Sequence, residues 1–207
     1  MNMEERPESG GAEPQAGAAG NLAPEAFFRK VAIRTWDAFV QDALLHVLAA
    51  LLVLVGSALT VGILSGPLIV GYIGTIRKRL RGEPAELTNV LDGLKRFLVS
   101  FLTALIIAVA VAVGSFLLVV PGVLAALFCM FALHRVAYED ASVAEALADS
   151  FGLVKDHFLN ALLLYVSLAI LSLAGAAIVV GFLLTLPLTF IALTVAYEEF
   201  TGARSGG

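Results

Sequence analysis

The sequence predicts an all-α integral membrane protein. We expect about six transmembrane helices, arranged as three helical hairpins that each follow an amphipathic interfacial helix on the cytoplasmic side. Two observations predict this class. The 207 residues are 59% hydrophobic and only 14% charged, whereas soluble domains carry about a quarter charged residues. In addition, Asp, Glu, Lys and Arg are absent from three long runs of the chain.

The three uncharged runs are residues 43–76, 97–134 and 157–197, with lengths of 34, 38 and 41 residues. One membrane-spanning helix needs about 20 residues, so each run suits two helices joined by a turn. The first hairpin is the shortest, and the sequence leaves open whether it crosses the membrane fully. Glycine and proline mark the turns: Gly62, Gly66 and Pro67; Gly114, Pro121 and Gly122; Gly175 and Gly181.

The basic residues predict the orientation. Both ends of a hairpin lie on one side of the membrane, so all 13 Lys and Arg residues fall on one face. Loops rich in Lys and Arg stay in the cytoplasm. We therefore expect a bacterial inner-membrane protein with cytoplasmic N- and C-termini. The cluster Arg77–Arg81 follows Ile76 directly and marks the membrane boundary.

The chain divides into three parts. Residues 1–23 form an acidic tail with little to bury, so we expect disorder there. Residues 24–200 form one transmembrane helical domain, and residues 201–207 form a flexible end. Within the domain, apolar residues at helical spacing predict the three interfacial helices. These cover residues 26–42, 87–98 and 142–158.

Two of these helices carry further signals. In residues 26–42, Lys30 and Arg34 lie on the face opposite Phe28 and Trp36. In residues 142–158, Ser142 and Glu145 have the spacing of a capping box, in which each side chain bonds the other residue's backbone N–H.

The two connections between hairpins differ in charge. Residues 77–96, the basic connection, hold six basic and three acidic residues. Residues 135–156, the acidic connection, hold two basic and five acidic residues. Two interpretations stay open. Either the basic connection binds lipid and the acidic one is solvated, or the two dock against each other.

The sequence contains no motif that predicts catalysis. The histidines His46, His134 and His157 lie in three different hairpins and lack metal-ligand spacing. Cys129 is the one cysteine, in an apolar run. The predicted membrane interior holds no Asp, Glu, Lys or Arg, which ion-coupled transporters normally need. We therefore expect no catalytic residue, no cofactor and no metal.

Two sets of residues are candidates for packing and binding. Small residues let membrane helices approach closely; here these are Gly62, Gly66, Ala104, Ala108 and Ala112. Basic residues beside a membrane attract anionic lipid headgroups; here these are Arg77, Lys78, Arg79, Arg81, Lys95 and Arg96.

One stretch, residues 121–163, resembles a known group. It opens with Pro121-Gly122, which is followed by an apolar helix and then by the acidic pair Glu139-Asp140. The next helix carries the pattern Ala146-Leu147…Ser150. This pattern is similar to the uncharacterised YciC-like bacterial membrane proteins and to the membrane domain fused to some glycerophosphodiester phosphodiesterases. The resemblance covers roughly residues 36–200. It implies six membrane helices and supplies no catalytic residues.

The leading hypothesis is a non-enzymatic inner-membrane protein of envelope homeostasis. Its partners would be membrane lipids, chiefly anionic, with a second copy or another membrane protein as further candidates, and no nucleic acid. The alternative is a channel or facilitator for a small or lipidic molecule. An enzyme acting on lipid headgroups ranks third.

Overall fold

The computed structural model describes residues 23–139, 141–176 and 179–202. The predictions made for residues 1–22 and 203–207 lie outside this part. The described part is all-helical, as predicted. In chain order the helices are α1 Pro24–Gln41, α2 Ala43–Leu59, α3 Ser65–Leu80, the 3-10 helix η1 Leu87–Arg96, α4 Phe97–Leu117, α5 Val119–Cys129, α6 Ala132–Tyr138, α7 Val143–Asp156, α8 Phe158–Ala176 and α9 Val179–Thr201.

The described helices include four that are long and apolar enough to cross a membrane. A fifth span results if α1 and α2, which meet at an angle of 94°, count as one broken span or a re-entrant segment. The short helix α3 is not one of the four. The prediction of membrane-length helices is therefore confirmed. The four are Leu87–Leu117, Val119–Tyr138, Phe158–Gly175 and Leu183–Thr201.

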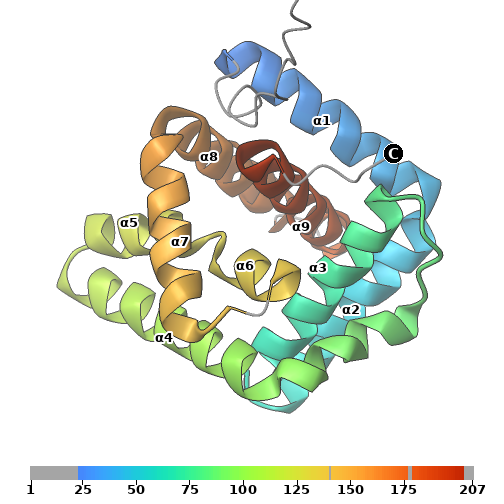
Figure 1. The fold of residues 1–207 in the computed structure, drawn as a ribbon, viewed down its shortest axis with the longest axis horizontal. Helices are drawn as coiled ribbons and strands as arrows, with labels where there is room; N and C mark the ends of the chain where they lie inside the picture. The colour runs from blue at the N-terminus through green and yellow to red at the C-terminus, as the bar shows by residue number, and fades with distance from the viewer. Residues whose placement is uncertain (1–22, 140, 177–178, 203–207) are drawn as a thin grey trace, which may run out of the picture.

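The cationic side of α1 faces the protein. The helix lies along one edge of the molecule, beside α8 and α9, while the α4–α5 hairpin lies at the opposite edge (Figure 1). Val31 is buried, whereas Trp36, placed on the apolar face by the sequence, is 60% exposed. Lys30 and Arg34 face other parts of the protein, because acidic side chains of α9 bind them.

Glycines allow the closest helix crossings. A Cβ at Gly71 of α3 would overlap the carbonyl oxygen of Val90, and one at Gly93 of η1 would overlap that of Pro67. The backbones of α3 and η1 therefore touch, which no larger residue at these two positions would allow. Because η1 leads directly into α4, this crossing fixes the position of the α4–α5 hairpin relative to the α2–α3 hairpin.

A break between α5 and α6 interrupts the second uncharged run, and the sequence did not predict it. The hydroxyl of Ser150, on α7, accepts a hydrogen bond from the Phe131 N–H (3.2 Å) and donates one to the Phe128 carbonyl (2.7 Å). One side chain thus satisfies backbone groups on both sides of the break.

Helix α7 begins with the predicted capping box. The Ser142 hydroxyl accepts from the Glu145 N–H at 3.4 Å, and the Glu145 carboxylate accepts from the Ser142 N–H at 2.8 Å. The bonds from Ser142 hold the pKa of the Glu145 carboxyl below its ordinary value, because they stabilise the ionised form.

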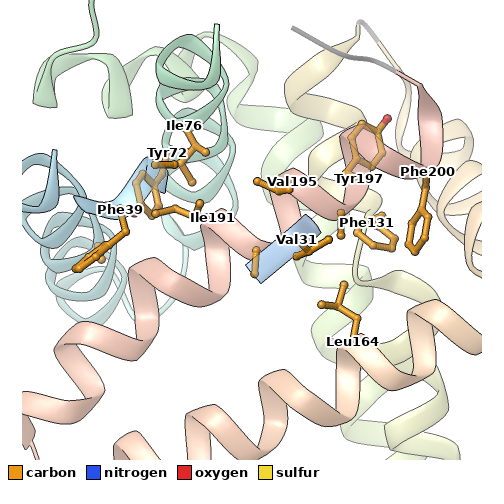
Figure 2. Close-up of a cluster of buried hydrophobic side chains, with 14 of the residues drawn as sticks. Val31, Phe39, Tyr72, Ile76, Phe131, Leu164, Ile191, Val195, Tyr197 and Phe200 are labelled. Atoms are coloured by element: carbon orange, nitrogen blue, oxygen red, sulfur yellow. The ribbon is translucent and has the colours of Figure 1, made fainter. Parts of the chain in front are cut away.

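The core surrounds the last turns of α9. Figure 2 shows side chains from α1, α3, α8 and the α5–α6 break around Ile191, Val195, Tyr197 and Phe200. Phe27 of α1 stacks on Phe200 with ring centroids 4.9 Å apart. Every residue of α9 from Thr194 to Phe200 is buried. The molecule is therefore packed most tightly near the end of α9, where its charged residues also gather.

Candidate functional site

Two buried carboxylates at the end of α9 organise the charged residues. Glu198 and Glu199 are 0% and 1% exposed. Lys30 donates to Glu199 at 2.5 Å, and Arg34 donates to Glu199 at 2.7 Å and to Glu198 at 2.9 Å. The guanidinium of Arg34 therefore bridges both carboxylates. This pairing satisfies charges that would otherwise be very costly to bury.

Tyr138 extends this network to α3 and α6. Its hydroxyl donates to Glu198 at 2.8 Å. The Arg77 guanidinium lies over its ring, 4.2 Å from the centroid, and donates to its backbone carbonyl at 3.2 Å. Four helices, α1, α3, α6 and α9, are thus joined through Arg34, Glu198, Tyr138 and Arg77. We call the surface around these four residues the charged face.

Arg96, at the end of η1, binds the C-terminal end of α6, where Tyr138 also lies. It donates to the carbonyls of Val136 (2.7 Å) and Glu139 (2.6 Å). The C-terminal end of a helix carries partial negative charge, so cations are favoured there. The basic and acidic connections therefore do contact each other. Arg77 and Arg96 make this contact by donating to backbone carbonyls of the acidic connection.

Other ion pairs lie nearby. Arg135 pairs with Asp149 at 2.7 Å and also with Glu139, which is 57% exposed at its side chain. Arg79, at the end of α3, pairs with Asp42, the residue between α1 and α2. Exposed pairs contribute little to stability. The Arg79–Asp42 pair matters more for geometry, because it holds both ends of the first hairpin at one level.

The six basic residues predicted to bind lipid headgroups thus divide into two groups. Arg77, Arg79 and Arg96 bind other parts of the protein, as described above. Lys78 is half-buried, Arg81 is exposed, and Lys95 is 78% exposed at its side chain, in a pair with Asp92. The second group is the more accessible to a ligand.

Two adjoining pockets lie beside Lys78 and Lys95. One, of about 440 Å³, is lined by Lys95, Arg96, Phe97 and Leu98 together with Val99, Ala141 and Ser142. The other, of about 180 Å³, contains Lys78, and Arg96 lines both. Cations and apolar side chains therefore line the larger pocket together, at the junction of η1 and α4.

The predicted packing residues lie in different settings. Gly66 lies against α4, where an added Cβ would meet Ser100 and Ala104. Gly62 lies in the turn between α2 and α3, with a φ of 84° and open space around it. Ala108 and Ala112 are exposed on α4.

The histidines have separate partners. His46 lies 3.3 Å from the Tyr72 hydroxyl, His134 lies 3.3 Å from the Thr194 hydroxyl, and the His157 ring stacks on Phe200. Within residues 23–139, 141–176 and 179–202, no group of three His, Cys, Asp or Glu side chains could hold a metal ion.

The sequence reasoning missed the two carboxylates that organise the charged face. Glu198 and Glu199 follow the last apolar run directly, as solvated residues at a helix end commonly do. A signal was present in α1, because Lys30 and Arg34 are four residues apart and so share one helix face. Two cations on one helix face can indicate a buried acidic partner.

Comparison with known proteins gives no match: no family model, no curated protein and no solved structure matches the chain. The resemblance of residues 121–163 to the YciC-like proteins stays a prediction.

Proposed function

We propose that the chain is a non-enzymatic bacterial inner-membrane protein that binds anionic lipids where η1 meets α4, with both termini in the cytoplasm. The observation that carries the proposal is the pocket where Lys95 and Arg96 adjoin Phe97 and Leu98. A lipid needs both kinds of contact, because its phosphate binds cations while its acyl chains lie along apolar side chains.

Exposure and charge support this assignment. Leu98 is 65% exposed and Phe97 is 37% exposed, so acyl chains can reach both. Lys78 and Asp92 line the adjoining pocket, and Asp92 pairs with Lys95. A headgroup beside Arg96 would therefore meet three cations, Lys78, Lys95 and Arg96, against the one carboxylate of Asp92. Lys and Arg residues at an anionic surface contribute about 1 kcal/mol each.

The test compares two double variants that remove the same charge. Lys78→Gln/Lys95→Gln removes the cations beside the pockets, and Arg29→Gln/Lys155→Gln removes two exposed cations on α1 and α7. Native mass spectrometry would follow dioleoyl phosphatidylglycerol titrated against each protein, with dioleoyl phosphatidylcholine as the neutral lipid. We expect the first variant to bind phosphatidylglycerol about thirtyfold more weakly, from about 2 kcal/mol lost.

The control variant should keep affinity close to that of the unmodified protein. An equal loss in both variants would show attraction by overall charge and not by this pocket. Unchanged affinity in Lys78→Gln/Lys95→Gln would contradict the proposal. An unassigned small molecule retained in place of lipid would favour the facilitator hypothesis.

A further inference from the structure

The N–H groups of the turn between α2 and α3 are satisfied within the hairpin itself. Each of the six N–H groups of residues 60–65 donates to an acceptor within residues 56–62. The distances run from 2.7 Å for Gly62 N to Ser57 O up to 3.3 Å for Thr60 N to Gly56 O. The hydroxyl of Thr60 also donates to the Gly56 carbonyl at 2.7 Å, and the hydroxyl of Ser65 donates to the Gly62 carbonyl at 2.6 Å.

A turn in water has no need of such closure, since water satisfies exposed N–H groups. In hydrocarbon every unsatisfied backbone group is costly, and irregular backbone persists there only when it is satisfied by the protein. The hydrogen-bond pattern of residues 60–65 therefore suits a turn that lies away from water.

The side chains of this turn are apolar and point outward. Leu59 is 79% exposed, Val61 is 93% exposed, and Ile63 is 49% exposed. Val61 also has a φ of 51°, a backbone conformation that disfavours β-branched residues and that glycine or asparagine adopts more easily. A valine at such a position indicates that its environment favours an apolar side chain.

The helices of this hairpin are too short to cross a bilayer. The 17 residues of α2 extend about 25 Å, and the 12 residues of α3 from Ser65 to Ile76, before its first cation, extend about 18 Å. The hydrocarbon core is about 30 Å thick. The Arg79–Asp42 ion pair holds both ends of the hairpin at one level, so neither helix can shift to reach further alone.

We propose that α2–α3 is a re-entrant hairpin, whose partner is the acyl-chain region of the bilayer. It enters from the charged face, turns within the hydrocarbon at residues 60–65, and returns to the same face. This inference does not depend on headgroup binding, because it rests on the turn, the helix lengths and the Arg79–Asp42 ion pair.

The test measures the depth of a nitroxide label in proteoliposomes. The chain has one cysteine, so Cys129→Ala provides a background in which Val61→Cys carries the label. Val61 is almost fully exposed, so the substitution removes little packing; Ile63→Cys serves as a second position. Lys155→Cys gives an aqueous reference, and Phe116→Cys marks the tip of the α4–α5 hairpin, whose helix α4 extends about 31 Å.

We expect the labels at positions 61 and 63 to collide with oxygen more than with a water-soluble nickel complex, and the label at Lys155 to do the reverse. The ratio of oxygen to nickel collisions at positions 61 and 63 should exceed the ratios of the Lys155 and Phe116 labels, because those two references lie near opposite surfaces of the bilayer. Nickel access at positions 61 and 63 equal to that at Lys155 would overturn the proposal. So would a collision ratio no higher than that of the Phe116 label, since the turn would then lie at a surface and not within the hydrocarbon.

Discussion

Arg34 is the residue on which the charged face depends most. Its guanidinium forms two hydrogen bonds, one to each buried carboxylate of α9. Lys30 reaches only Glu199 and is more exposed, so it cannot replace Arg34 at Glu198. Arginine suits this position because its planar group binds two carboxylates at once, which a lysine ammonium does with less geometric precision.

We expect Arg34→Ala to destabilise the protein by about 3–5 kcal/mol, because it leaves buried carboxylates without their cation. Thermal unfolding in detergent, followed by circular dichroism, would measure the loss. Arg29→Ala provides the control, since Arg29 is an exposed cation on the same helix. Equal melting temperatures for the two variants would show that the network adds nothing to stability.

At the scale of the element, the crossing of α3 and η1 depends on glycine at particular positions. Gly71 and Gly74 lie three residues apart on α3, yet only Gly71 touches the backbone of η1. At Gly74 an added Cβ would meet nothing within 4 Å. The same substitution should therefore have opposite effects at the two positions.

Gly71→Ala should destabilise the fold by about 1–3 kcal/mol, because α3 and η1 must move apart. Gly74→Ala should be neutral or stabilising by up to about 1 kcal/mol, because alanine favours a helix over glycine. Melting temperatures of the two variants would be compared under identical conditions. A loss at Gly74 as large as that at Gly71 would mean that helix contact is not the reason.

The elements show what a sequence can and cannot predict. Absence of charge predicted where apolar helices lie, because the cost of charge in hydrocarbon acts on each residue separately. The capping box at Ser142 was predictable too, since it is a local interaction. The break between α5 and α6 was not, because its hydrogen-bond partner Ser150 lies on another helix. For the same reason, the sequence could not show that Arg77 and Arg96 donate to backbone carbonyls at the end of α6.

At the scale of the whole molecule, packing is uneven. In the span of α9, 61% of the residues are buried, against 17% in the span that contains α4. The α4–α5 hairpin is therefore mostly exposed to its surroundings, while the end of α9 lies in a core shared by several helices. Stability should thus depend far more on α9 than on α4.

Two isoleucines measure this difference. Ile191→Ala, at a fully buried position of α9, should cost about 2–5 kcal/mol, because it leaves a cavity in the core. Ile106→Ala, at a position of α4 that is 43% exposed, should cost much less, because lipid can fill the space. Unfolding in a mixed-detergent titration would give both values. Similar losses would show that α4 packs against something beyond this chain.

The unequal hairpins α2–α3 and α4–α5 also have a consequence for membrane shape. As the proposed re-entrant hairpin, α2–α3 would occupy volume only among the lipids next to the charged face, whereas α4 is long enough to occupy both leaflets. Each molecule would then be wider in cross-section on that side and resemble a wedge. Many such wedges in one patch would make the bilayer convex on the side of the charged face. The protein would therefore gather where the membrane already has this curvature.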